Sequence, residues 1–376
     1  MDNRKKIATI TWLKYNNYGT LLQCYALQRI LEELGYDNYV LDDSHIIEPY
    51  QKTFRYIIAS SCYCFLSKLL NPFGIKKYNI VDPVIVRKCR QFVSKYIKVD
   101  YAINNLDDVS KRYDCFICGS DQIWNPGPSW YSKLNTSFYY AGFTDKKKIA
   151  YAPSLGVKDY PENRKDEFVY YLSSFAALSC REEEGCKIIN ELTGEKVKKV
   201  VDPTLLLDEK RWRNLIGEKK RKGGYVLCYF LTPQPWYWQF LHTIKTINDL
   251  KVLSIYTQYQ PEIEPSNVVY TGPREFLEYI DGANLVLTDS FHATLFSAIL
   301  QTPFYTLERF PFGSSEYAQN LRLKNLNEMM GVFDRYVTDP TSKKISNYET
   351  IDFISIRNNI NHYSVLSIEY LKESLK

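Results

Sequence analysis

The sequence lacks the long apolar runs of membrane-spanning proteins. Its 376 residues include no stretch of about 20 uncharged apolar side chains, which is the length that a helix needs to cross a bilayer. The N-terminal stretch MDNRKKIATI has neither the apolar core nor the small-residue cleavage site of a secretory signal. We therefore expect a cytoplasmic protein that does not span a membrane.

Common cofactor and catalytic motifs are also missing. The chain has no P-loop, no nucleophile elbow and no helix with two zinc-binding histidines. The turn after the first expected strand, NNYGT, has one glycine, whereas the dinucleotide-binding fingerprint needs several. We therefore expect neither a nicotinamide or flavin cofactor nor a bound metal.

Charge and cysteine content narrow the class further. The net charge of +5 is modest and no DNA- or RNA-binding motif is present, so we expect no nucleic-acid partner. The nine cysteines are an odd number and are most simply free thiols of a reducing cytoplasm. Cys115 and Cys118 have the spacing of redox and zinc sites, but in a strand residues three apart point to opposite faces. The 32 tyrosines suit a sugar-binding surface because their rings pack while their hydroxyls stay hydrated.

Alternating strand and helix patterns predict an α/β protein with two Rossmann-like domains that face a cleft. We assign residues 1–207 to an N-terminal domain with a helical insertion at about 44–100, and residues 225–345 to a C-terminal domain. Residues 208–224, rich in Lys and Arg, are the expected linker. A helical pattern within residues 346–376 is expected to pack back on the first domain.

One segment of the expected insertion allows two interpretations. Residues 54–73 are apolar, with only Arg55 and Lys68 charged. They form either a core helix or a patch that lies on a membrane surface and receives a lipid-carried substrate.

Polar turns follow four of the expected strands, at residues 119–125, 180–185, 202–204 and 289–292. In open α/β sheets ligands bind at the carboxyl ends of strands, where helix N-termini offer free N–H groups to anions. His292 lies on the last of these turns, between a strand and a helix. It is either a group that exchanges protons with a substrate, or a helix cap or buried hydrogen-bonded histidine.

The other turns carry charged and amide side chains whose roles stay open. Arg181 either binds a carboxylate or phosphate with its guanidinium or pairs with the glutamates at 182–184. Asp121 and Gln122 either bind sugar hydroxyls or cap the segment that follows them. Asp202 precedes a proline and is expected to form a turn rather than act as a base.

These turns, in this order, together with the opening NNYGTLLQCYALQ stretch, resemble the polysaccharide pyruvyltransferase family. The segments that carry the resemblance are residues 17–23, 25–28, 119–125, 179–182, 201–206, 288–292, 320–322 and 334–335. Ala293 departs from the family pattern, which usually has glycine after the histidine.

The resemblance implies a fold similar to that of GT-B glycosyltransferases, with the acceptor on the N-terminal domain and the donor on the C-terminal domain. It also implies phosphoenolpyruvate as donor, a saccharide as acceptor, a cyclic ketal as product, released phosphate and no further cofactor. The acceptor is expected to be a precursor of a cell-surface polysaccharide. It is either free or linked to a lipid diphosphate, and a lipid-linked acceptor would bring the protein to the inner face of the cell membrane.

Site residues follow from the same resemblance. His292, Arg181 and Arg322 are carried over by position. The other residues expected to contact substrate are Ser290, Gly119, Ser120, Gln122, Asn17, Tyr18 and Gly19.

The implied reaction needs an acid, a base and fixed cations for a donor of about three negative charges. We expect His292 to be the acid or a hydrogen-bond donor to the departing phosphate, and Asp289 or Asp121 to be the base. Arg274 is a further candidate cation. Two other functions stay open: a GT-B glycosyltransferase that uses a nucleotide sugar, and a non-catalytic partner in polysaccharide assembly.

Overall fold

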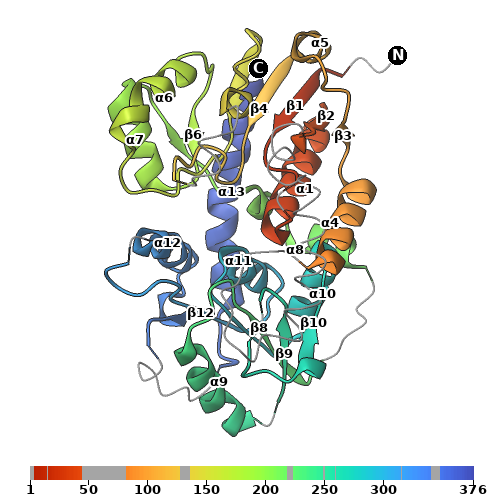
Figure 1. Cartoon of the computed structure of the whole chain (residues 1–376), viewed down its shortest axis with the longest axis vertical. Coiled ribbons are helices and arrows are strands. Elements are labelled where there is room, and N and C mark those ends of the chain that lie inside the picture. Colours follow the sequence, from red (N-terminus) through yellow and green to blue (C-terminus); the bar gives the residue numbers. More distant parts are fainter. Residues whose placement is uncertain are drawn as a thin grey trace, which may run out of the picture. The chain divides into compact units, whose positions relative to one another are not determined.

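The computed structural model describes residues 4–14, 16–44, 82–127, 136–217, 223–248, 250–258, 260–314, 316–339 and 348–376. The chain forms two compact units, whose elements are labelled in Figure 1. Unit 1 comprises Met1–Pro83, Cys89–Leu207 and Tyr363–Lys376, and unit 2 comprises Val84–Lys88 and Asp208–His362. Each unit has its own parallel sheet with helices, so the predicted α/β fold with two Rossmann-like domains is confirmed.

The sheet of unit 1 has five parallel strands in the order β3-β2-β1-β4-β5. These strands are β1 (Lys6–Ile10), β2 (Asp37–Leu41), β3 (Val99–Asp100), β4 (Cys115–Cys118) and β5 (Lys147–Ala150). The helices that connect and follow them are α1 (Tyr18–Glu33), α4 (Pro83–Tyr96), α5 (Leu106–Arg112), α6 (Lys165–Leu172) and α7 (Glu183–Thr193). A separate pair, β6 (Ser179–Cys180) and β7 (Lys198–Lys199), precedes the short 3₁₀ helix η5 (Pro203–Leu206).

The sheet of unit 2 has six parallel strands in the order β10-β9-β8-β11-β12-β13. These strands are β8 (Tyr225–Tyr229), β9 (Lys251–Ile255), β10 (Val268–Val269), β11 (Leu285–Thr288), β12 (Phe304–Leu307) and β13 (Tyr336–Val337). The α-helices of the described part of this unit are α8 (Glu209–Ile216), α9 (Pro235–Asn248), α10 (Pro273–Gly282), α11 (Phe291–Ile299), α12 (Asn320–Met330) and the first half of α13 (Phe353–Leu375).

In both parallel sheets the order of the strands switches once from one side of the first strand to the other, and each switch point is a place where a ligand can bind. In unit 1, β1 pairs with β2 on one side and with β4 on the other. In unit 2, β8 pairs with β9 on one side and with β11 on the other. The loops that leave the two central strands at such a switch point diverge and open a crevice at the carboxyl end of the sheet. A ligand site is therefore expected at the loops after β1 and β4 in unit 1, and at the loops after β8 and β11 in unit 2.

Helix α8 corrects the expected linker. Residues 209–216 are helical and lie in unit 2, with Trp212, Leu215 and Ile216 buried at helical spacing. Trp212 packs edge to face against Phe296 of α11 at a ring distance of 4.8 Å. The first half of the Lys- and Arg-rich region is therefore folded structure, while residues 218–222 lie outside the described residues.

The two halves of α13 belong to different units. From Tyr363 onward the helix is part of unit 1, where Ser367 Oγ accepts a hydrogen bond from Val201 N at 3.0 Å and Tyr370 OH donates to Ala150 O at 2.8 Å. Of the expected insertion at 44–100, residues 45–81 lie outside the described residues, and so does the apolar segment 54–73.

The core of unit 1 includes the cysteine pair of the sequence CFIC. Cys115 and Cys118 lie on β4 and are buried, and burial raises the pKa of the Cys115 thiol to about 11 and that of Cys118 further. Trp124 is fully buried and stacks on Tyr140, as expected of a core residue. No helix in the described part of the chain is both long and apolar enough to span a bilayer.

Candidate functional site

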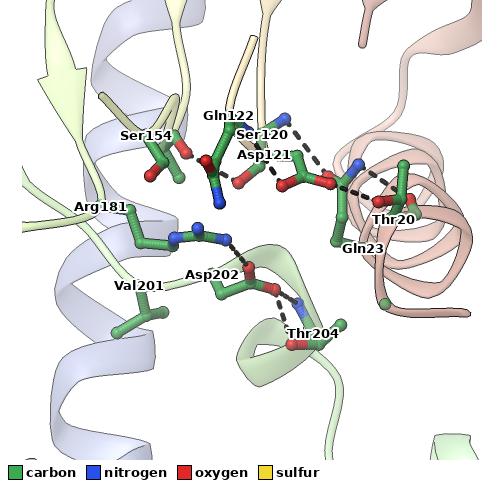
Figure 2. A network of polar contacts seen from close by, with 12 residues as sticks. Thr20, Gln23, Ser120, Asp121, Gln122, Ser154, Arg181, Val201, Asp202 and Thr204 are labelled. Atoms are coloured by element: carbon green, nitrogen blue, oxygen red, sulfur yellow. Dashed lines mark hydrogen bonds and ion pairs between the residues drawn. The ribbon is translucent and has the colours of Figure 1, made fainter. Parts of the chain in front are cut away.

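The switch point of unit 1 is held together by Gln23 of helix α1. Its Nε2 donates to Thr11 Oγ1 at 3.0 Å and to Thr20 O at 2.9 Å, and its Oε1 accepts from Ser120 N at 3.2 Å. Thr11 Oγ1 in turn donates to Ser120 O at 3.1 Å. Figure 2 shows the contact of Gln23 in α1 with Ser120 in the turn after β4. One buried amide thus fixes the loops after β1 and β4 relative to each other.

The N-terminus of α1 is closed by its own cap. Asn17 Oδ1 accepts hydrogen bonds from Gly19 N at 2.9 Å and Thr20 N at 3.4 Å. Tyr18 is 3% exposed and packs in the core. The structure therefore gives Asn17, Tyr18 and Gly19 a role in ending the loop and starting the helix.

The turn after β4 requires an unusual backbone. Gly119 has φ +129°, and a Cβ there would lie 2.0 Å from Tyr151 O, so only glycine fits. Asp121 has φ +68°, a conformation that is costly for a residue with a side chain and is concentrated at functional sites. Thr20 Oγ1 donates to Asp121 Oδ2, and Gln122 N donates to Asp121 Oδ1 at 2.8 Å. The Asp121 carboxylate is thus oriented from both sides.

Arg181 follows β6 directly and forms a buried ion pair that the sequence did not reveal. Its Nη1 donates to Asp202 Oδ2 at 2.7 Å, and its Nε donates to Glu182 Oε1 at 3.2 Å. The side chains of Arg181 and Asp202 are 5% and 0% exposed. The other oxygen of Asp202 accepts from the N–H and the hydroxyl of Thr204, at 3.0 and 2.7 Å, and caps η5. Asp202 is therefore both the expected turn former and the main partner of Arg181.

Carboxylates outnumber cations around Arg181. Burial disfavours the charged guanidinium, but the neighbouring carboxylates of Glu182, Asp202 and Asp121 outweigh burial and raise the pKa of Arg181. Glu182 Oε1 also accepts the Ser154 hydroxyl at 2.6 Å. In Figure 2 the guanidinium lies between the turn that carries Gln122 and the Asp202 carboxylate. The cluster in unit 1 is therefore acidic and rich in hydrogen-bonding groups.

The switch point of unit 2 is held together by Asp289, which follows β11. Its two carboxylate oxygens accept hydrogen bonds from Leu231 N at 2.6 Å and Thr232 N at 2.8 Å, in the loop after β8. Asp289 is 1% exposed, and burial raises its pKa, although the Arg309 charge and the two N–H groups oppose this effect. The structure therefore gives Asp289 the task of joining two loops.

His292 lies in the first turn of α11, just beyond this junction. Ser290 is the N-cap of the helix, and its Oγ accepts from Ala293 N at 3.4 Å. His292 is partly exposed, whereas Ser290 and Ala293 are buried. The imidazole is thus placed at the carboxyl end of β11, where the strand-turn-helix pattern predicted it.

Comparison with known proteins decides the family. The sequence model described as "Polysaccharide pyruvyl transferase" matches residues 17–309, which include parts of both units. The chain belongs to this family. Among curated proteins none matches the sequence significantly.

Solved structures show only weak overall similarity to this member of the pyruvyl transferase family. A glycosyltransferase from Rickettsia africae is 11% identical, with 100% of this chain and 99% of that chain covered and a TM-score of 0.46. A UDP-GlcNAc 2-epimerase from Neisseria meningitidis bound to UDP-GlcNAc is 12% identical, with 98% of this chain and 100% of that chain covered and a TM-score of 0.46. At these TM-scores we draw no functional conclusion from either protein.

The expected cations of this family member belong to both units. Arg181 lies in unit 1, while Arg274 and Arg322 lie in unit 2. The guanidinium of Arg274 donates to Ile216 O, at 2.6 Å from Nη2, and pairs with Glu278 at 2.8 Å. These contacts satisfy the end of α8 and give Arg274 a structural role. Arg322 is partly exposed in the first turn of α12, with Nη2 donating to Gln319 Oε1 at 3.4 Å.

Sequence reasoning missed one cation, Arg309. It follows β12 by two residues, and its Nε donates to Thr232 Oγ1 at 2.9 Å, beside the backbone that binds Asp289. A signal was present, because a charged pair, Glu308 and Arg309, directly follows the apolar strand FYTL. Within the described ranges no group of three His, Cys, Asp or Glu side chains is placed to hold a metal ion.

Proposed function

We propose that the protein transfers the pyruvyl group of phosphoenolpyruvate to two hydroxyls of a saccharide, forming a cyclic ketal and releasing phosphate. The observation that carries this proposal is the family match, which extends over residues 17–309. The donor, the use of two hydroxyls and the release of phosphate are the parts that this proposal adds to the family assignment. The proposed acceptor is a precursor of a cell-surface polysaccharide, and the proposed site of action is the cytoplasm.

The reaction balances without an external oxidant or reductant. A proton adds to the methylene carbon of the donor, which becomes a methyl group, and the adjacent C2 becomes electrophilic. One sugar oxygen bonds to C2, and the C2–O bond to phosphate breaks with its electron pair on phosphate. A second sugar oxygen closes the ring. Of the two hydrogens lost by the hydroxyls, one replaces the proton given to the methylene carbon and the other leaves with phosphate.

His292 is the proposed acid. Imidazole is the side chain that exchanges protons near neutral pH, and this ring is partly exposed at the carboxyl end of β11. Asp121 is the proposed base in preference to Asp289, because one of its two hydrogen-bond donors is a side-chain hydroxyl, whereas both donors to the 1% exposed Asp289 are backbone N–H groups. Asp121 is 7% exposed, and its backbone is held in a conformation typical of functional sites.

Charge supports a division of roles between the units. In the cluster around Arg181 in unit 1, the three carboxylates of Asp121, Glu182 and Asp202 outnumber the one guanidinium. Such a cluster repels a donor with about three negative charges but accepts hydrogen bonds from neutral sugar hydroxyls. We therefore assign the acceptor to unit 1 and the donor to unit 2.

The direct test is turnover of phosphoenolpyruvate with candidate saccharides, offered free and linked to a lipid diphosphate. Phosphate release should accompany a mass gain of about 70 Da on the acceptor, the increment that the transition from two hydroxyls to a pyruvyl ketal requires. His292→Gln should lower the rate by about 10²–10⁴-fold, the usual contribution of a general acid. His242→Gln, on an exposed position of α9 in the same unit, is the matched control and should keep full activity.

Two results would contradict the proposal. Wild-type activity in His292→Gln would remove the assignment of the acid. Thermal protection by a UDP-sugar, with none by phosphoenolpyruvate, would replace the proposed reaction with glycosyl transfer, because a ligand stabilises only the state that binds it.

A further inference from the structure

The backbone after β12 in unit 2 is fixed by side chains from two other segments. Asn320 Oδ1 accepts hydrogen bonds from Arg309 N at 3.2 Å and Phe310 N at 3.0 Å, and its Nδ2 donates to Phe310 O at 2.7 Å. Gln234 Nε2 donates to Arg309 O at 3.3 Å. Asn320 is 3% exposed, at the start of α12. Every backbone N–H and carbonyl group of residues 309–310 is therefore bound to a side chain.

The guanidinium of Arg309 is also held in place, by contacts with Thr232 and Phe310. Its Nε donates to Thr232 Oγ1 at 2.9 Å, and its central carbon lies 4.8 Å from the centroid of the Phe310 ring. Among the described residues this guanidinium forms no ion pair and donates no hydrogen bond other than the one to Thr232. None of the described residues therefore accepts a hydrogen bond from Nη1 or Nη2, the edge of the guanidinium that can make a bidentate contact with an oxyanion.

Arg309 differs in this respect from Arg181 and Arg274, two of the cations that the sequence favoured. Arg181 is enclosed by Asp202 and Glu182, and Arg274 is bound to Ile216 O and Glu278. Thr232, which accepts from Arg309, also donates its backbone N–H to the buried carboxylate of Asp289. Both oxygens of that carboxylate accept hydrogen bonds from backbone N–H groups. The guanidinium of Arg309 therefore lies beside the switch point of unit 2 without donating a hydrogen bond to the Asp289 carboxylate.

We propose that Arg309 binds an oxyanion of the donor, its phosphate or its carboxylate, and that Thr232 and Asn320 position it for this contact. This inference rests on the proposed function, because it takes phosphoenolpyruvate as the ligand. Fixing Nε and the backbone in advance reduces the conformational freedom that Arg309 loses on binding, so more of the interaction is realised as affinity. Arg309 is a substrate-binding residue, and Thr232 and Asn320 are positioning residues.

The test is direct binding of phosphoenolpyruvate by isothermal titration calorimetry, independent of turnover. Arg309→Gln should weaken binding by about 30-fold or more, since it removes a charge-assisted bidentate contact. Arg309→Lys keeps the charge but loses the fork, and should weaken binding by about 10-fold. Arg211→Gln removes one exposed guanidinium from α8 of the same unit, and its dissociation constant should stay within about twofold of wild type.

A second variant separates positioning from folding. Thr232→Val is nearly isosteric and removes only the hydroxyl that accepts the hydrogen bond from Arg309 Nε. Binding should weaken by about 3- to 10-fold, and the melting temperature of the free protein should not change. The salt dependence of the dissociation constant should become shallower in Arg309→Gln and stay the same in Thr232→Val, because only the former loses a charge. Thermal protection by inorganic phosphate and by pyruvate, measured separately, assigns the anion: the ligand whose protection is lost in Arg309→Gln is the one that Arg309 binds.

The possible results test the role of Arg309 separately from the proposed pyruvyl transfer. If wild type binds phosphoenolpyruvate and Arg309→Gln binds it equally well, the role of Arg309 is refuted and the proposed function stands. If wild type binds no phosphoenolpyruvate, both are refuted. If Arg309→Gln does not fold, unchanged binding in both Arg309→Lys and Thr232→Val refutes the inference.

Discussion

Replacing Asp43 by Asn should change how the stability of unit 1 depends on pH. Asp43 follows β2 by two residues and is fully buried. Its carboxylate accepts from Leu13 N at 3.1 Å, Lys14 N at 3.2 Å and Tyr139 OH at 3.2 Å, and so holds the loop after β1. Burial, reinforced by the neighbouring Asp42, outweighs these hydrogen bonds and raises the pKa of Asp43 from 3.8 to about 7.

The sign of the effect follows from the proton balance. Between about pH 4 and about pH 7 the unfolded chain releases the Asp43 proton while the folded chain retains it, so the free energy of unfolding falls as pH rises. The stability associated with this group is complete below the unfolded pKa and is lost as pH rises through the folded pKa. The difference between 3.8 and about 7 corresponds to about 4 kcal/mol, of which about 3 kcal/mol falls between about pH 4.5 and about pH 8.

The Asn variant does not titrate at this position. Its amide oxygen can replace Oδ2, which serves Leu13 N and Tyr139 OH, but its NH₂ group then faces Lys14 N, and one hydrogen bond is lost at a cost of about 1 kcal/mol. Asp43→Asn should therefore be slightly less stable than wild type in acid and more stable by about 3 kcal/mol at about pH 8.

Urea unfolding of wild type and Asp43→Asn at several pH values between about 3.5 and 8 measures this crossing, which is expected near about pH 4.5. Asp107→Asn, which changes an exposed carboxylate of α5 in the same unit, is the control, and its curve should run parallel to that of wild type. A stability difference between Asp43→Asn and wild type that is constant over this range would refute the reasoning.

The strand-turn-helix units were predictable because their signals are local. In the sequence, residues 20–34 have the apolar periodicity of a helix and Gly35 is a typical stop; α1 ends at Glu33, with Gly35 at φ +92°. The turn at 289–292 was placed correctly for the same reason. A short apolar run precedes it, apolar residues at helical spacing follow it, and Ser290 between them is a residue type that favours N-caps. Period and capping are properties of neighbouring residues, so one sequence suffices to read them.

Pairings across the fold could not be read in this way. The sequence left open whether Arg181 binds an anionic ligand or pairs with the glutamates that follow it; Glu182 is a partner, but the shorter contact is with Asp202, which follows the neighbouring strand β7. Which loops meet depends on the strand order, and the order places β4 beside β1 and β11 beside β8. The periodicity of a strand is the same whichever neighbour it has, so the joining roles of Gln23 and Asp289 were not visible.

The linker assignment failed because charge was given more weight than spacing. The Lys- and Arg-rich region contains Trp212, Leu215 and Ile216, three and four residues apart, which is the spacing of one helical face. The charged residues between them cover the exposed side of α8. The signal at Arg309 was weak for a different reason, because a charged pair after an apolar strand does not show that the guanidinium reaches Thr232 in another loop.

Two substitutions in unit 1 should separate buried from exposed contacts. Asp202→Asn leaves a buried guanidinium with too few anionic partners and should lower the free energy of unfolding by about 3–5 kcal/mol, whereas Asp108→Asn, in an exposed ion pair with Lys111, should cost less than about 1 kcal/mol in urea unfolding; equal costs would refute the ion-pair argument. Gly119→Ala should cost about 3 kcal/mol or more, because it combines φ +129° with a Cβ placed 2.0 Å from Tyr151 O. Gly194→Ala is the control for conformation alone, since φ is +72° there with nothing within 4 Å of the new Cβ, and its cost should be only about 1 kcal/mol. If the two alanine variants lost the same stability, the contact with Tyr151 would not be what requires glycine in the turn after β4.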